Sequence, residues 1–253
     1  MIPLVSVILP VYEPNPAWLR AAVESALSQD GVSLEVILVD DGSRRQPAEP
    51  IVADLGVRLF TTPRNEGIAA ARNRAAELAE GAWLAFLDQD DLWDAGKLGI
   101  QLAAAVGNDL EVLYSNAREI DADGRITCHR MDWPAPVTGL LDLCSVNRVP
   151  QLTAVVRREA YWAVGGQNEE NRLCTCDYEM WLALAATGRP FWYDGRVLGS
   201  YRRHAGQDTK DDFRGRCGTY YALWQTFRKY PAAFGPAETA ALQSRLANLA
   251  AIK

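Results

Sequence analysis

Three aspartates in the first half of the chain have the types and spacing that could hold a metal ion. Asp88, Asp90 and Asp91 directly follow an apolar run over residues 82–87. Oxygen-only ligands suit magnesium or manganese, and a buried strand ending here would present the carboxylates at the sheet edge where ligands bind. The plain alternative is a cluster that caps a helix beginning at Leu92. The neighbouring motifs have to decide between these interpretations.

Two other apolar runs also end in polar residues, in PVYE at residues 10–13 and in DDGS at residues 40–43. The Tyr12 ring could stack on a nucleotide base, and the Asp40 carboxylate could accept a hydrogen bond from a base imide. The alternative for DDGS is a loop followed by a helix N-cap. Polar residues at three strand ends nevertheless favour one shared ligand site.

An arginine and a further aspartate complete the set of candidate site residues. Arg72 lies about one turn into a predicted helix behind Asn65-Glu66-Gly67, facing the same crevice or pairing with a surface acid. Asp177 begins a predicted amphipathic helix over residues 177–186, where the helix dipole and free backbone amides favour its ionised form. An ionised carboxylate within hydrogen-bond reach of a substrate hydroxyl can remove its proton. Asp177 is therefore a candidate general base.

The segments that must position these residues alternate between strand and helix patterns. Strands are predicted at residues 4–9, 34–39, 57–61 and 82–87, with helices at 18–27 and 68–79. This alternation predicts an α/β fold with a mostly parallel sheet flanked by helices. A mixed second half follows, with strands at 111–116 and 152–157, a hairpin at 119–127, a helix at 159–164, and helices over 213–253 broken near 231–236.

Four segments in this order, VSVILPVYEP, VDDGS, RNEGIAAARN and FLDQDD, resemble the inverting nucleotide-sugar transferases of glycosyltransferase family 2. Further similarity follows in VVRREAYWAVGGQNEE, CDYEMWLALAATG and YRRHAGQDT. The resemblance implies a GT-A fold over residues 1–212, in which 1–116 bind the nucleotide sugar and 117–212 form the acceptor side. Residues 213–253 would be a helical extension.

The resemblance also implies roles for single residues. Nucleotide binding would fall to Pro10, Val11, Tyr12, Glu13, Asp40, Gly67, Arg72, Asp88, Gln89, Asp90 and His204, with Asp88 and Asp90 holding Mn²⁺ or Mg²⁺ and Asp177 as the base. One position departs from the family pattern, because Cys176 stands where a glutamate is usual. Its effect on activity is not readable from the sequence.

The composition of the chain limits the classes of partner that are expected. The chain has 253 residues, a net charge of −6 and a pI near 5.1, so it lacks the basic surface that nucleic-acid binding requires. Its five cysteines contain no CxxC pair, which makes a zinc site unexpected. No apolar run approaches the ~20 residues of a membrane span and no signal peptide is recognisable, so cytoplasmic residence is expected. Peripheral contact with the inner face of a membrane stays open.

The expected reaction is inverting transfer of a sugar, UDP being the family's commonest carrier, to a hydroxyl of a carbohydrate or lipid-linked acceptor. Such a reaction would serve polysaccharide, lipid-linked glycan or cell-surface glycan synthesis. A catalytically silent nucleotide-sugar-binding protein is one alternative, supported by Cys176. A sugar nucleotidyltransferase is another, although the segment after Leu9 lacks the Gly-rich, basic phosphate loop expected of that class.

Overall fold

The computed structural model describes residues 4–207 and 212–251, and its core is one nine-stranded sheet ordered β3-β2-β1-β4-β8-β6-β9-β5, with β7 paired to β6. The first half of the chain supplies four parallel strands, as the sequence predicts. They are β1 (Leu4–Val11), β2 (Ser33–Asp40), β3 (Arg58–Thr61) and β4 (Trp83–Phe86). Their carboxyl ends meet at one edge of the sheet.

The second half extends this sheet with strands of both directions. β8 lies between β4 and β6 and is antiparallel to both, whereas β9 runs parallel to β6. The bounds are β5 (Leu92–Trp93), β6 (Val112–Ile120), β7 (Ile126–Cys128), β8 (Val155–Arg157) and β9 (Phe191–Arg202). The expected hairpin of residues 119–127 is confirmed as the β6–β7 pair.

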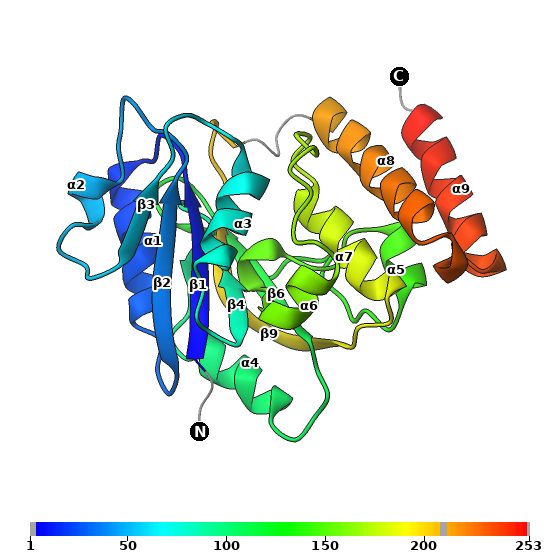
Figure 1. The fold of residues 1–253 in the computed structure, drawn as a ribbon, viewed down its shortest axis with the longest axis horizontal. Coiled ribbons are helices and arrows are strands. Elements are labelled where there is room, and N and C mark those ends of the chain that lie inside the picture. The colour runs from blue at the N-terminus through cyan, green and yellow to red at the C-terminus, as the bar shows by residue number, and fades with distance from the viewer. Residues whose placement is uncertain (1–3, 208–211, 252–253) are drawn as a thin grey trace.

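Alternate residues of β1 face two hydrophobic cores. Val7 and Leu9 pack with α1 (Pro16–Leu27), α2 (Glu49–Val52) and α4 (Lys97–Ala105), while Ile8 packs with α3 (Ile68–Glu77). This is the period-2 pattern of a strand buried on both faces. Figure 1 accordingly shows α1 and α3 on opposite faces of the parallel strands.

Five helices of the second half share the α3 face: α5 (Leu140–Ser145), α6 (Arg158–Ala163), α7 (Cys176–Ala186), α8 (Asp212–Lys229) and α9 (Pro236–Ala251). α8 packs on α7 and α9 packs on α5, so these two helices form the edge of the molecule opposite α2 (Figure 1). The predicted break near residues 231–236 is confirmed by a 3₁₀ turn at Pro231–Ala233. The final residues of the predicted helical range, 252–253, lie outside the described residues.

The expectation that α7 is amphipathic is wrong. Met180, Trp181, Leu182 and Leu184 cover its circumference and all are buried. α5, α6 and α8 surround the helix, so it has no wide solvent-facing side. A helix that is apolar all round is a core helix.

Two other segments differ from the sequence predictions, and two observed elements were not predicted. The predicted strand 152–157 is a 3₁₀ turn (Gln151–Thr153) followed by the shorter β8, because Thr153 bonds locally to Pro150. Leu92 does not begin a helix but starts β5, which pairs with β9. Neither β9 nor α4 was expected. No helix among the described residues is long and apolar enough to cross a bilayer.

Candidate functional site

The polar ends of β1 and β4 open into one cleft of about 880 Å³, which the first turns of α3 and α7 also line. Parallel strands place their carboxyl-end loops side by side, which is why residues far apart in the sequence meet here. All but two of the residues expected at the site line this cleft: Pro10, Val11, Tyr12, Gly67, Arg72, Asp88, Gln89, Asp90, Asp177 and His204.

Glu13 and Asp40 are the two exceptions, and both carboxylates bind loop backbone instead. Asp40 is 1% exposed and accepts hydrogen bonds from the amides of Ser43 at 2.9 Å and Ala48 at 2.8 Å. Glu13 accepts from the amides of residues 44–46, and the Arg44 amide contributes most to lowering its pKa. In this conformation the two acids therefore shape the pocket wall from behind. Asp41, not Asp40, lines the cleft.

We expect Asp40→Ala to destabilise the fold by about 2–4 kcal/mol, because two buried amides would lose their acceptor. Tyr12→Ala is the matched comparison, since its side chain also ends a strand but is 47% exposed. Urea denaturation of both variants measures the difference. Equal free energies of unfolding would contradict this role for Asp40.

Arg72 connects the two carboxylates with the clearest chemical roles. It is 4% exposed, and its Nη2 donates to Asp88 Oδ1 at 2.6 Å. It also lowers the pKa of Asp177 electrostatically. Cys176, the departure from the family pattern, is buried with its Sγ 3.9 Å from Arg72 Nη1. The alternative of a surface ion pair for Arg72 is therefore wrong.

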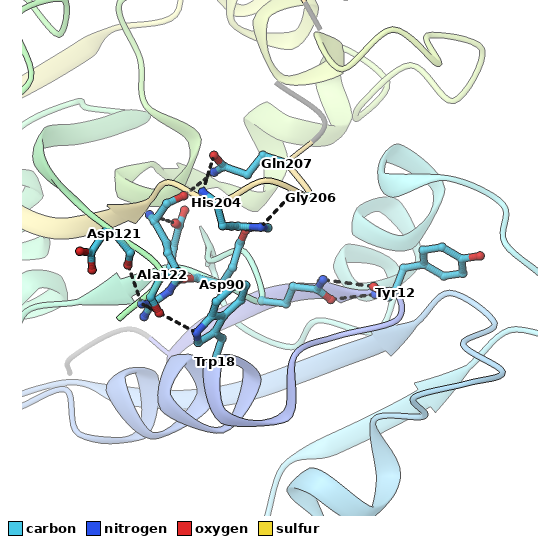
Figure 2. Close-up of polar contacts among 11 residues, drawn as sticks. Tyr12, Trp18, Asp90, Asp121, Ala122, His204, Gly206 and Gln207 are labelled. Atoms are coloured by element: carbon cyan, nitrogen blue, oxygen red, sulfur yellow. Dashed lines mark hydrogen bonds and ion pairs between the residues drawn. The ribbon is translucent and has the colours of Figure 1, made fainter. Parts of the chain in front are cut away.

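Asp90 is paired with His204 across the cleft. Their Oδ2 and Nε2 atoms lie 2.8 Å apart, and the Gly206 amide donates to His204 Nδ1 at 3.3 Å. Because Nδ1 is the acceptor of that bond, the proton of a neutral His204 lies on Nε2 and is donated to Asp90. Trp18 packs against the imidazole with ring centroids 4.7 Å apart (Figure 2). The imidazole is thus held in one orientation toward the carboxylate.

Gln89 joins the ends of two strands. Its side-chain amide accepts from the Tyr12 backbone amide at 2.8 Å and donates to the Tyr12 carbonyl at 3.1 Å, as Figure 2 shows. The Tyr12 ring points away from this contact and stays exposed. Gln89 therefore fixes the backbone from which the candidate base-stacking ring projects.

Burial dominates the titration of two cleft carboxylates. Desolvation raises the pKa of Asp90, and repulsion from Asp88 adds to this, while His204 acts in the opposite direction. Desolvation likewise raises the pKa of the half-buried Asp177, against the opposing effect of Arg72. The helix terminus does favour the ionised form of Asp177 through its backbone amides, as expected, but burial has the larger effect on the pKa. A higher pKa makes Asp177 a stronger base once ionised.

Glu179 lies on the same helix as Asp177 but lines a separate cavity of about 430 Å³ between α7 and α8. Its two carboxylate oxygens accept from Asn168 and Asn171, each at 2.9 Å. Two residues along an α-helix turn the side chain by roughly 200°. Glu179 is therefore not placed to replace Asp177 as a base in the cleft.

Within the described residues, no group of three or more His, Cys, Asp or Glu side chains is placed to hold a metal ion by itself. Asp88 and Asp90 nevertheless present two carboxylates at one strand end; burial raises the pKa of Asp90, and the neighbouring Asp88 carboxylate adds to this. Magnesium commonly takes one or two protein carboxylates and completes its shell with phosphate oxygens and water. The donor set fits a cation that arrives with a diphosphate.

Sequence reasoning missed the basic side of the cleft. Its lining includes Arg172 from the loop before α7, Arg214 and Arg216 from α8, and Arg245 from α9. No motif marked them, and arginine is about as frequent in the C-terminal helices as in the rest of the chain, so its frequency carried no signal. Trp133 also lines the cleft, whereas Trp162 and Trp192 do not.

Comparison with known proteins defines the class to which this fold and site belong. The family model "Glycosyl transferase family 2" matches residues 6–165. The chain is 35% identical over 167 residues to an uncharacterized glycosyltransferase of Haemophilus influenzae. It is 34% identical over 115 residues to the Escherichia coli UDP-Glc:alpha-D-GlcNAc-diphosphoundecaprenol beta-1,3-glucosyltransferase WfgD. These matches cover 62% and 45% of this chain and 64% and 45% of the relatives, less than two thirds of either.

Solved structures agree on the fold. The mannosyltransferase PcManGT of Pyrobaculum calidifontis, in complex with GDP-Man and Mn²⁺, superposes with a TM-score of 0.72 at 20% identity, covering 99% of this chain and 74% of that one. Staphylococcus aureus TarS 1–349 in complex with UDP gives 0.68 at 19% identity, with 99% and 71% coverage. Both are GT-A glycosyltransferases. The chain belongs to glycosyl transferase family 2 and has the GT-A fold.

Proposed function

We propose that this chain transfers a sugar, with inversion, from a nucleotide-diphosphate sugar to an acceptor hydroxyl. The observation that carries the proposal is that Asp88 and Asp177 line one cleft and share the buried Arg72 between them. One carboxylate is placed for the leaving diphosphate and the other for the attacking hydroxyl. Residues 1–116 would bind the donor and 117–212 the acceptor, with the C-terminal helices completing the acceptor side.

The donor half has the features that a nucleotide requires. Tyr12 offers an exposed ring for stacking on a base, and Gly67, with φ +101°, allows the backbone to approach a phosphate closely. The structural neighbours are bound to UDP in one case and GDP-Man in the other. We take UDP as the first carrier to test because the WfgD relative is described as UDP-Glc-dependent.

We propose that Asp88 and Asp90 hold Mn²⁺ or Mg²⁺ against the donor diphosphate. A bound cation supplies Lewis-acid stabilisation of the charge that grows on the leaving diphosphate. His204 donates to Asp90 and so keeps this carboxylate ionised and oriented while the donor binds. Arg72 orients Asp88 from the other side through its own hydrogen bond.

Nucleotide affinity should therefore depend on a divalent cation. Without it, Asp88 and Asp90 would face the diphosphate as like charges, and UDP binding should weaken by about tenfold or more. Calorimetric titration with MnCl₂ and with excess chelator measures this, and Asp90→Asn should lose most of the manganese effect. Equal affinity in both conditions would contradict the metal role.

The attack itself needs a base on the acceptor side. Asp177 is ionised above its raised pKa and can accept the proton of a hydroxyl that approaches the sugar opposite the diphosphate. Direct displacement in line forms the new glycosidic bond as the sugar–phosphate bond breaks. An α-linked donor would then give a β-linked product, without a covalent enzyme intermediate.

The acceptor is proposed to be a carbohydrate or lipid-linked sugar in glycan synthesis. A further relative, the chondroitin synthase of Pasteurella multocida, is 31% identical over 196 residues, which are 74% of this chain and 19% of that protein. WfgD is named for a diphosphoundecaprenol-linked acceptor. A cytoplasmic protein at the inner face of a membrane would meet acceptors of the second kind.

A catalytically silent binding protein is the alternative, favoured only by Cys176. A panel of nucleotide sugars, screened with manganese for thermal stabilisation, identifies the donor because a specific ligand stabilises by mass action. Release of UDP from the donor so identified, with and without candidate acceptors, then separates the two functions. Binding without any turnover would support the silent protein.

A further inference from the structure

The outer face of α8 carries large apolar side chains that are each more than a third exposed in the described structure. Their spacing of seven, four and three residues places them within an arc of roughly 60° on the helix. Ala222, on the opposite face of α8, is buried in the core, and so is Leu223, at the side of the helix. We call this outer row the aromatic stripe; its members and exposed fractions are Phe213 (68%), Tyr220 (48%), Trp224 (40%) and Phe227 (38%).

Basic side chains border the aromatic stripe. On the helix circumference Arg216 lies on one side of it and Arg228 on the other. The Arg228 guanidinium stacks over the Trp224 ring at 4.6 Å from its centroid. Residues 213–229 contain four basic and no acidic side chains, in a chain whose net charge is −6. This helix is thus positive where the molecule as a whole is negative.

The neighbouring helix shows that the stripe is not a general property of this edge of the molecule (Figure 1). Over residues 236–248 of α9, where side-chain burial is described, the exposed positions are small or polar: Pro236, Ala237, Ala240, Gln243, Ser244, Ala247 and Asn248. Single exposed apolar residues are ordinary, but a contiguous row of aromatics indicates an interaction surface. The question is which partner suits aromatic rings bordered by positive charge.

We propose that the aromatic stripe of α8 docks on the surface of an anionic lipid bilayer. Tryptophan and tyrosine rings favour the boundary between headgroups and acyl chains. Arginine stems can follow the apolar surface while their guanidinium groups reach lipid phosphates. A helix with one apolar face and basic borders lies in the plane of the interface and binds more tightly as the lipid becomes more anionic.

A second copy of this chain is a poorer partner for the same face. A two-fold symmetric interface pairs each surface with itself. The four basic residues of α8 would then face an equal number of cations, and Asp212 at the start of the helix is the one acidic residue on it to offset them. Like charges placed opposite one another disfavour association. An anionic bilayer has the complementary charge.

Docking would also place the cleft beside the lipid surface. Arg214, Arg216 and Thr219, on the first turns of α8, line the cleft, while the stripe lies on the outer side of the same helix. An acceptor anchored in that bilayer would reach the basic side of the cleft without leaving the membrane. This consequence for the acceptor rests on the proposed function; the docking itself does not.

Vesicle sedimentation tests the docking. The full chain is mixed with vesicles of phosphatidylcholine alone, or of equal parts phosphatidylcholine and phosphatidylglycerol, at low and at high salt. The test variant combines Phe213→Ser, Tyr220→Ser and Trp224→Gln, none of which lines the cleft. Phe227 is retained because its ring packs against Phe234. Val106→Ser, which removes a 76% exposed apolar side chain at the end of α4, is the matched control.

The wild type and Val106→Ser should sediment with the anionic vesicles, less so at high salt, and the triple variant should bind them at least about tenfold more weakly. UDP affinity and melting temperature should be the same in all three proteins. A wild type that stays in the supernatant with both lipids overturns the proposal, as does a dimer in sedimentation velocity that the triple variant abolishes. Vesicle binding without UDP binding would refute the proposed function and leave the docking intact.

Discussion

Asp177→Asn should reduce sugar transfer by about 100-fold or more while leaving nucleotide-sugar affinity near that of the wild type. Asparagine keeps the shape of the side chain and removes its ability to take a proton. An interaction needed only in the transition state lowers kcat and kcat/KM together. Steady-state kinetics and calorimetric titration of the donor measure the two quantities separately.

Glu179→Gln is the matched control for Asp177→Asn. It removes a carboxylate from the same helix, but one that lines the other cavity and binds Asn168 and Asn171. Transfer by this variant should stay within a few-fold of the wild type. Full activity in Asp177→Asn, or an equal loss in both variants, would contradict the assignment of the base.

The raised pKa of Asp177 gives this base a pH signature. Only the ionised carboxylate can accept a proton, so kcat/KM should fall as the pH drops through the pKa of Asp177. Because burial raises that pKa, the fall should begin above the range of about 4 at which an ordinary aspartate titrates. The acid limb of the pH–rate profile should be absent from the residual activity of Asp177→Asn.

Arg72→Met should produce the largest loss of stability among the variants considered. Removing one partner of a buried ion pair costs about 3–5 kcal/mol, since Asp88 would be left without its cation. For a chain of this size the melting temperature should fall by roughly 10 °C. Methionine fills much of the same volume, so the loss would reflect charge more than packing.

Arg74→Met provides the control on the same helix. Arg74 is 57% exposed and pairs with Glu77 three residues later, an interaction worth about 0.5 kcal/mol or less. Differential scanning calorimetry of both variants compares the two sites. Equal melting temperatures would show that the Arg72–Asp88 pair contributes no more than a surface pair.

Arg72→Met should also change the chemistry of Asp177. Arg72 lowers the pKa of this carboxyl, so its removal should raise the pKa further and move the acid limb of the pH–rate profile to higher pH.

Cys176→Glu introduces the carboxylate that the family usually has beside the base. In the present chain the Cys176 Sγ at this position lies 3.9 Å from Arg72 Nη1. A large gain in activity would mark the natural chain as a weakened enzyme.

The sequence determined the parallel half of the fold and most of the expected residues that line the cleft. Apolar runs at residues 4–9, 34–39 and 82–87 are long, regular and directly followed by polar residues. Local spacing is enough to recognise such elements, and parallel strands necessarily place their carboxyl ends together. Pro10, Asp88 and Asp90 were therefore expected at the edge where the structure has the cleft.

Only the tertiary structure decided which of two neighbouring carboxylates faces the cleft. Asp40 and Asp41 are adjacent and chemically identical, yet Asp40 binds loop amides and Asp41 lines the cleft. Likewise, Asp177 and Glu179 share a helix but open into different cavities. Successive side chains point in directions set by local backbone geometry, which residue type does not reveal.

β9 and the surroundings of α7 also depended on contacts between distant segments. β9 pairs with β6 and β5, which lie about 80 to 100 residues before it, and Gly195 and Gly199 interrupt its own strand pattern. The pKa of Asp177 could likewise not be predicted from the local sequence. The sequence predicted a helix N-terminus, whose amides favour the carboxylate, but packing by distant segments buried the group, and desolvation is the larger effect. Spacing along the chain determined which residues could act, and burial by segments remote in sequence determined how strongly they hold a proton.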